Sequence, residues 1–130
     1  MHQREDAASA VPRILVIDDD RMILDLVESI LEPEGLAIRT AEDGANAIDL
    51  FQREAAISLI ILDWHMPGMP GEQVLDQLLA IRSGARVIVS SAASPSQVER
   101  AFAGRGVLQF LPKPFQVQNL LAAVRLALAA

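Results

Sequence analysis

The chain has 130 residues, a formal net charge of −6 and no cysteine, and 52% of its residues are hydrophobic. This length suits one domain, and this apolar content suffices for a buried core, so a mainly disordered chain is excluded. The acidic balance argues against a nucleic-acid surface or an anionic-membrane surface as the main function. The lack of cysteine excludes disulfides, thiolate zinc sites and cysteine catalysis.

The two ends of the chain carry no targeting or spanning signal. The opening MHQREDAASA has no apolar region of the kind found in a signal peptide, and the apolar stretch Leu120–Ala130 is too short to cross a bilayer. We therefore expect a flexible tail over residues 1–12, one domain over residues 13–130, no membrane contact and a cytoplasmic location.

Short apolar runs alternate with longer segments of helical period. The apolar runs predict five strands, at Arg13–Ile17, Leu36–Ala41, Ile57–Leu62, Arg86–Val89 and Val107–Leu111. The helical periodicity predicts five helices, at Arg21–Glu32, Gly44–Arg53, Glu72–Ile81, Ser94 to about Ala103, and Phe115–Leu128. This alternation with short connections is typical of an α/β domain in which helices cover both faces of a doubly wound parallel sheet.

Polar residues follow the predicted strands. The first strand leads into Asp18–Asp20, the third into Asp63, the fourth into Ser90-Ser91, and the fifth is followed by Lys113. In such sheets ligands bind beyond the carboxyl ends of the strands, so these side chains are expected to converge. Carboxylates brought together repel each other unless a hard cation such as Mg²⁺ lies between them. A lysine and a hydroxyl suit phosphoryl oxygens, and an aspartate is a competent nucleophile for phosphoryl transfer.

Four stretches of the chain resemble the receiver domain of bacterial two-component response regulators. They are ILVIDDD (14–20), LIILDWHMPGMPG (59–71), VIVSSA (87–92) and FLPKPF (110–115). The resemblance covers nearly the whole chain and implies a flavodoxin-like (βα)5 fold with the strand order 2-1-3-4-5. It also implies a phosphorylation-operated switch, which takes a phosphoryl group from a sensor histidine kinase or a histidine phosphotransfer protein and signals to a downstream effector protein or domain. Such a domain catalyses only its own phosphorylation and dephosphorylation.

The resemblance implies a phosphoacceptor and a metal site. Asp63 corresponds to the phosphoacceptor of the family, and Asp18 and Asp19 correspond to its acidic pair. Mg²⁺ is then expected to bind Asp18, Asp19 and Asp63 together with the backbone carbonyl of His65. Asp19 is the more direct ligand of the pair, while Asp18 acts more through water.

The resemblance also implies a conformational switch. Ser91 corresponds to the hydroxyl that moves toward the phosphoryl group, Lys113 to the lysine of the site, and Phe110 to the aromatic residue that rotates in response. The bond between Lys113 and Pro114 is expected to be cis.

Three residues add expectations of their own. Pro70 stands where the family usually has Asp or a similar polar residue, so the next helix is expected to begin with a different cap. The resemblance also implies that the positions two past the phosphoacceptor and two past the switch hydroxyl, here His65 and Ala93, tune attack by water. The methyl group of Ala93 cannot orient that water, which predicts slow hydrolysis of the phosphorylated form. Trp64 adjoins Asp63 and is the only tryptophan, so its fluorescence should report metal binding.

Other functions stay open at this stage. A phosphorylation-silent interaction module would keep the fold without the chemistry, but the residues of the site are intact. A metal-dependent phosphatase that uses Asp63 as nucleophile on outside substrates needs a second carboxylate that acts as an acid close after the nucleophile, and the loop 64–71 contains none. The sequence leaves open whether the chain is a stand-alone regulator or part of a longer protein.

The last predicted helix carries a weakly polar face opposite its core stripe. Leu126 lies in this face, and Arg125 is the only charge of the helix. The other members of the face are Asn119, Ala122, Ala123, Ala129 and Ala130. This face predicts a docking surface or a homodimer contact.

Overall fold

The computed structural model describes residues 11–93, 96 and 107–129. Its strands are β1 (Arg13–Ile17), β2 (Ala37–Ala41), β3 (Ile57–Asp63), β4 (Val87–Ser91) and β5 (Val107–Pro112). Its helical segments are α2 (Arg21–Leu31), the short 3-10 segment η1 (Glu32–Glu34), α3 (Gly44–Arg53), α4 (Gly71–Ile81) and α6 (Val117–Ala129).

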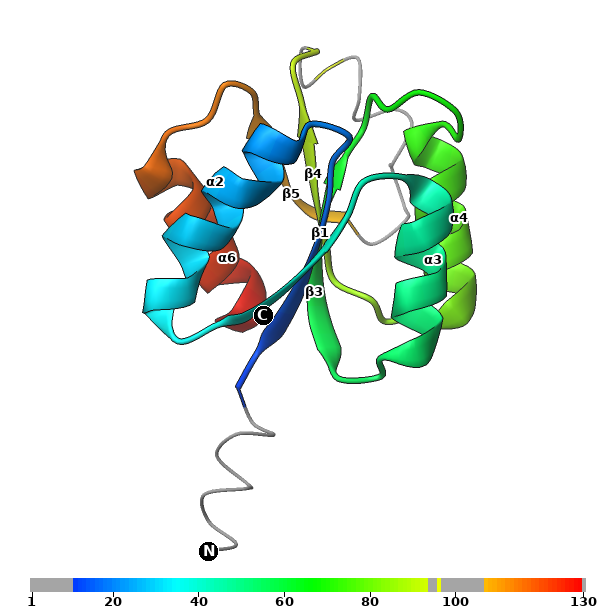
Figure 1. The fold of residues 1–130 in the computed structure, drawn as a ribbon, viewed down its shortest axis with the longest axis horizontal. Helices are drawn as coiled ribbons and strands as arrows, with labels where there is room; N and C mark the ends of the chain where they lie inside the picture. Colours follow the sequence, from blue (N-terminus) through cyan, green and yellow to red (C-terminus); the bar gives the residue numbers. More distant parts are fainter. Residues whose placement is uncertain (1–10, 94–95, 97–106, 130) are drawn as a thin grey trace, which may run out of the picture.

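The strands form one parallel sheet in the order β2-β1-β3-β4-β5. Helices α2 and α6 cover one face of the sheet, and α3 and α4 cover the other (Figure 1). This arrangement confirms the predicted doubly wound α/β fold and its strand order. Because β1 has β2 on one side and β3 on the other, the chain changes direction across the sheet next to β1. The crevice beyond the ends of β1 and β3 is the usual ligand position in this fold.

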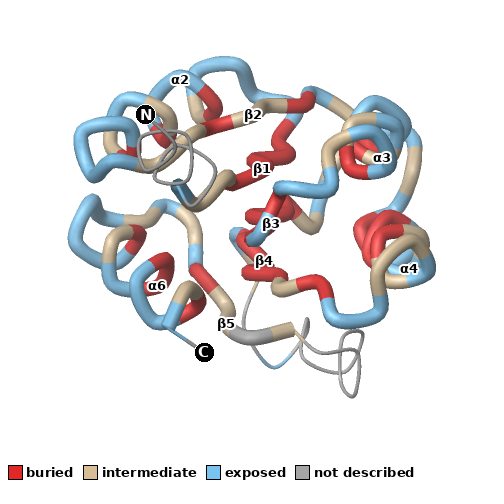
Figure 2. The backbone as a smooth tube through the Cα atoms, turned by 90° about the horizontal axis from the view of Figure 1, so that it is seen from below, coloured by how far each residue is buried: buried red, intermediate tan, exposed pale blue. Residues whose placement is uncertain are grey.

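Each face of the sheet has its own apolar core. In β1, Ile14 and Val16 pack against α2 and α6, whereas Leu15 and Ile17 pack against α3 and α4. Figure 2 shows that buried residues occupy the strands and the sheet-facing sides of the helices, while the outer sides are exposed. A strand covered on both faces needs apolar residues at nearly every position, which explains the uninterrupted run in β3.

The helix starts differ in how they are capped. The side chain of Asp20 accepts a hydrogen bond from the backbone N–H of Met22 and thereby caps α2. Asp43 caps α3 in the same way through the N–H of Asn46. Pro70 occupies the cap position of α4 without a side-chain hydrogen bond, so the expected change of cap is present. Pro has the extended backbone that a cap requires, but it offers no acceptor to the first turn.

Two expectations fall outside the described residues, namely residues 1–10 of the expected tail and, apart from Ser96, the helix expected from Ser94 to about Ala103. Over the ranges that the structure does describe, no helix has the length and apolar character needed to traverse a membrane.

Candidate functional site

Three carboxylates meet beyond the ends of β1 and β3. Asp18 follows β1 directly, Asp63 ends β3, and the two strands are paired. One carboxylate oxygen of each of Asp18, Asp19 and Asp63 lies within 4.8 Å of the other two. Asp18 and Asp63 are buried, while Asp19 is exposed, so the cluster is closed toward the sheet and open toward solvent on one side.

Lys113 reaches this cluster from the loop that follows β5. Its Nζ lies 2.6 Å from Oδ2 of Asp18 and 3.5 Å from Oδ1 of Asp63. The backbone holds the lysine in place, because the Lys113 N–H donates to the carbonyl of Ser91 at 2.9 Å. The bond from Lys113 to Pro114 is cis, as expected.

The electrostatics of the cluster favour the arrival of a cation. Burial, the charge of Asp18 and, to a smaller extent, the charge of Asp19 together raise the pKa of Asp63 to about 6, against the opposing effects of Lys113 and the His65 backbone N–H. Burial lowers the pKa of Lys113, but its hydrogen bond to Asp18 and the charge of Asp63 outweigh that effect, so its pKa is raised overall. One ammonium group therefore faces more negative charge than it neutralises.

The donor set suits a hard divalent cation. Carboxylate oxygens are the ligands that Mg²⁺ prefers, and Mg²⁺ commonly binds one or two carboxylates while it keeps waters. The backbone orients two of the three side chains: Asp20 N–H donates to Oδ1 of Asp18 at 2.9 Å, and His65 N–H donates to Oδ1 of Asp63 at 3.3 Å. The His65 side chain is exposed. The cluster fits the magnesium site that the sequence predicts.

The expected switch residues lie on neighbouring strands. Ser91 ends β4, is fully buried, and accepts a hydrogen bond at 3.0 Å from the N–H of Ala93 through its Oγ. Phe110 is half-buried in β5, where it pairs with Val89 and packs on the core next to α3 and α4. Sequence reasoning thus places both residues on the strands that border the site.

Two features of the site were not predicted. Ser90 pairs in register with Asp63, and its buried hydroxyl has no hydrogen-bond partner among the described residues. Gly71 lies against Trp64, since a Cβ at Gly71 would come within 2.5 Å of the Trp64 carbonyl oxygen and 2.9 Å of its ring. A side chain at Gly71 would force Trp64 to shift, so a glycine allows the loop after Asp63 to pack closely on the start of α4. A Gly seven positions after a Trp is not a pattern that indicates such a contact.

Two hollows flank the carboxylate cluster. A hollow of about 570 Å³ is lined by the loop after β3 and the start of α4, including Trp64 and His65. A second hollow, of about 330 Å³, lies between α2 and the loop after β5, where Ile23, Leu26 and Lys113 line it. Its walls are mainly apolar, and one end of the Lys113 side chain belongs to the cluster. The cluster is therefore accessible next to a surface that a protein partner could cover.

Comparison with known proteins gives consistent results. Residues 14–125 match the family described as response regulator receiver domain. The response regulator MprA of Mycobacterium sp. is 33% identical over 113 residues, which are 87% of this chain and 49% of MprA. The transcriptional regulatory protein CpxR of Escherichia coli is 35% identical over 115 residues, which are 87% of this chain and 47% of CpxR. The chain thus spans about half the length of these relatives.

Solved structures show the same fold. The CheY-like receiver domain protein from Methanospirillum hungatei has a TM-score of 0.86 at 26% identity, covering 92% of this chain and 95% of that protein. The signal receiver domain of a LuxO repressor protein from Vibrio parahaemolyticus has a TM-score of 0.83 at 30% identity, covering 92% and 91%.

These relatives bear on one earlier expectation. A direct contact with nucleic acid was not expected from the acidic composition, yet CpxR is a transcriptional regulatory protein of which this chain matches only about half. The charge argument therefore applies to this domain and not to any longer protein that contains it. With a matching family over residues 14–125, a shared fold and relatives that are response regulators, the chain belongs to the response regulator receiver domain family of two-component signal transduction.

Proposed function

We propose that this receiver domain accepts a phosphoryl group on Asp63 from a phosphohistidine of a sensor kinase or a phosphotransfer protein, with Mg²⁺ as cofactor. The observation that carries the proposal is the position of Asp63, whose buried carboxylate lies within reach of two further carboxylates and 3.5 Å from the Nζ of Lys113. This set provides a nucleophile, a cation site and a positive charge at one point.

The residues would divide the chemistry as follows. A carboxylate oxygen of Asp63 attacks the phosphorus, the bond between phosphorus and the donor imidazole breaks, and the imidazole leaves with the electron pair and takes up a proton. Asp18, Asp19, Asp63 and the His65 carbonyl would hold Mg²⁺, which neutralises charge on the transferring phosphoryl oxygens when bound. Lys113 already lies between Asp18 and Asp63 and can pair with a phosphoryl oxygen by a small movement.

The proposed output uses Ser91 and Phe110. In this structure the Ser91 hydroxyl is engaged with the Ala93 N–H. A phosphoryl group on Asp63 offers a stronger, charged acceptor, so the hydroxyl is expected to turn toward it and leave Ala93. Space beside Ser91 then admits the half-buried Phe110 ring, and the surface over β5 changes. Phosphorylation would thus shift the population between two packings of the same domain.

The proposed phosphodonor docks beside Lys113. Met22 and Leu26 on α2 are large apolar side chains with 78% and 45% of their surface exposed. Leu26 lines the hollow between α2 and the loop after β5, which Lys113 also lines, and Met22 lines an adjoining hollow on α2 that shares Leu26. A partner helix that covers this apolar surface could place a histidine beside the carboxylate cluster.

The chain divides, in this proposal, into a tail at 1–12 and the receiver domain at 13–130. The alternative is an interaction module that keeps the fold but is not phosphorylated. The two functions differ in whether Asp63 accepts a phosphoryl group. A phosphatase that acts on outside substrates would need a carboxylate that acts as an acid in the loop just after the nucleophile, and residues 64–71 contain none; Glu72, in the first turn of α4, is the acidic residue that lines the hollow next to Trp64.

Intact-mass measurement after incubation with acetyl phosphate tests the proposal. One phosphoryl adduct is expected with Mg²⁺, none with a chelator, and none in Asp63→Asn. Asp49→Asn is the matched control, because Asp49 is exposed on α3 and, among the residues that the structure describes, pairs with Arg53. If neither acetyl phosphate nor a phosphorylated histidine protein gives an adduct, the silent module is favoured instead.

A further inference from the structure

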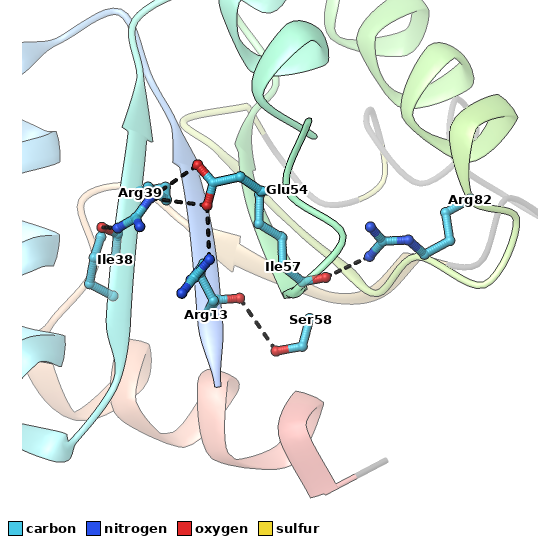
Figure 3. Close-up of polar contacts among 7 residues, drawn as sticks. All are labelled: Arg13, Ile38, Arg39, Glu54, Ile57, Ser58 and Arg82. Atoms are coloured by element: carbon cyan, nitrogen blue, oxygen red, sulfur yellow. Dashed lines mark hydrogen bonds and ion pairs between the residues drawn. The ribbon is translucent and has the colours of Figure 1, made fainter. Parts of the chain in front are cut away.

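Four arginines lie toward the amino ends of the strands, at the end of the sheet opposite the carboxylate cluster. Arg13 begins β1, Arg39 lies in β2, Arg82 follows α4, and Arg86 precedes β4. Figure 3 shows Arg13, Arg39 and Arg82 near the amino-terminal ends of β1 and β3. Glu54 forms ion pairs with two of these guanidinium groups: its Oε1 lies 3.1 Å from Nη1 of Arg13 and 3.1 Å from Nε of Arg39. Positive charge therefore collects here in a chain whose net charge is −6.

Arg82 and Arg86 differ from the other two. In the part of the chain that the structure describes, Arg82 donates from Nη1 to the Ile57 carbonyl at 2.5 Å and stacks 4.3 Å from the centre of the Phe51 ring. Arg86 donates to the last carbonyls of α6, at 3.3 Å for Leu128. These contacts use neutral acceptors and one N–H-bearing nitrogen of each guanidinium. Since a guanidinium carries five N–H donors, each group keeps donors for a further ligand.

A cavity lies between these two arginines. It has a volume of about 320 Å³ and is bounded by the α3–β3 connection, the foot of β3 and the α4–β4 connection. Small residues such as Ala55, Ala56 and Gly84 line it together with Arg82 and Arg86, and none of its lining residues is acidic. Its volume lies at the lower end of the range for small-molecule sites.

We propose that this cavity binds a phosphate dianion, either free phosphate or the phosphate of a small monoester. Planar guanidinium groups bind tetrahedral oxyanions through paired N–H donors, and a half-buried position strengthens such charge-assisted bonds. An anion there would also neutralise the guanidinium charges of Arg82 and Arg86, which have no carboxylate partner among the described residues. The site is separate from the phosphoacceptor edge, because the cavity lies at the Ile57 end of β3 and Asp63 lies at the other.

A titration with sodium phosphate, followed by two-dimensional amide NMR at constant ionic strength in the presence of a chelator, tests this site. The amide signals of Ser58 and Gly84 are expected to shift and saturate, whereas sodium chloride leaves them unchanged. Glycerol 2-phosphate as a second ligand separates the two sources: tighter binding than free phosphate indicates a monoester site, and weaker binding indicates a site for free phosphate.

Three variants make the result specific. Arg82→Gln should weaken binding at least about tenfold, through the loss of a charged donor pair. Arg53→Gln is the matched control, because Arg53 is exposed and pairs with Asp49 outside the cavity. Lys113→Ala should leave the shifts of Ser58 and Gly84 intact. Retained binding in that variant shows that the cavity acts independently of the phosphoacceptor edge, so this proposal and the proposed function can fail separately.

A fourth variant protects the test against misfolding of Arg82→Gln. Ala55 is exposed at the rim, and Ala55→Glu places a carboxylate there without removing an arginine contact. It should abolish the saturating shifts while the remaining spectrum stays dispersed. The proposal would be wrong if the shifts failed to saturate, or if they were equal in Ala55→Glu, Arg82→Gln and Arg53→Gln. Either result would show that the arginines only stabilise this end of the sheet.

Discussion

Lys113 donates a 2.6 Å hydrogen bond to Asp18, whereas its distance to the phosphoacceptor candidate Asp63 is 3.5 Å. The lysine is therefore held mainly by the carboxylate of Asp18, which follows β1, and still lies close to the end of β3. This geometry makes it the principal counter-ion of two buried acids. It also leaves the ammonium free to move toward a phosphoryl group without leaving the site.

The first prediction concerns that counter-ion. Lys113→Ala should lower the free energy of unfolding of the metal-free protein by about 1–3 kcal/mol near neutral pH, since it leaves buried carboxylates without a positive partner. Adding Asp63→Asn to this variant should restore part of the loss, because it removes one of the two repelling charges. Urea unfolding of both single variants and the double variant measures the coupling. Strictly additive effects would contradict the pairing.

The second prediction follows from the pKa of Asp63, which burial and then Asp18 raise from 3.8 to about 6. Between these two values the folded state binds more protons than the unfolded state, so this group makes the free energy of unfolding fall as pH rises from about 4 to about 6. Below about pH 4 the stabilising contribution of protonated Asp63 to the free energy of unfolding is fully present, and above about pH 6 this contribution is lost.

Asp63→Asn isolates this effect, because the other titrating groups are common to both proteins. In the presence of a chelator the variant should match the parent near pH 4 and exceed its free energy of unfolding by about 1–2 kcal/mol near pH 7. Urea unfolding across this range measures the difference. A difference that does not change with pH would mean that Asp63 has an ordinary pKa.

The third prediction concerns the metal. Trp64 follows Asp63 and packs on Gly71, so a cation that draws the carboxylates together should alter its fluorescence. Mg²⁺ titration should give a saturating change, and Asp19→Asn should weaken the apparent affinity about tenfold or more by removing one ligand. Asp49→Asn should bind as the parent does. An equal loss in both variants would indicate general charge screening and not a defined site.

Much of this architecture follows from local patterns. The continuous apolar run of β3 predicts a strand covered on both faces, and the rule that polar residues at strand ends share one edge predicts that Asp18, Asp63 and Lys113 meet. Their separation in the sequence, 95 positions between Asp18 and Lys113, is no obstacle, because the strand order fixes their proximity.

Other features depend on contacts that no local pattern carries. Three consecutive aspartates look alike in the sequence, and only the turn into α2 makes Asp20 a helix cap rather than part of the cluster. Ala123 was assigned to the exposed face of the last helix, but it is buried, and its carbonyl accepts from Gln109 of β5 at 2.8 Å. A small side chain does not reveal which way it faces. The link between Arg13 and Glu54, 41 positions apart, is equally invisible.

The fourth prediction concerns the lifetime of the phosphorylated form. The backbone N–H of Ala93 bonds to the Ser91 hydroxyl, and its methyl group offers no acceptor to a water molecule that attacks the acyl phosphate. Ala93→Glu should therefore hydrolyse faster than the parent, by a factor of ten or so if one oriented water is gained. Decay of the intact-mass adduct over time measures this rate, with Ala93→Gln as the uncharged control. A parent that decays faster than Ala93→Glu would overturn the prediction.

The fifth prediction concerns α6. Leu126 has 65% of its surface exposed, and the neighbouring Arg125 is engaged with Glu34, so an apolar side chain stands on this face beside a neutralised charge. If this face makes a homodimer, Leu126→Glu should reduce the dimer fraction at least about tenfold, because a charge must be desolvated at the contact. Met22→Glu is the matched control, since Met22 is also apolar and exposed but lies on α2. Light scattering across a concentration series, with and without phosphorylation, measures the dimer. A dimer that Leu126→Glu leaves unchanged rules out this face, and a parent that stays monomeric in both states rules out the dimer itself.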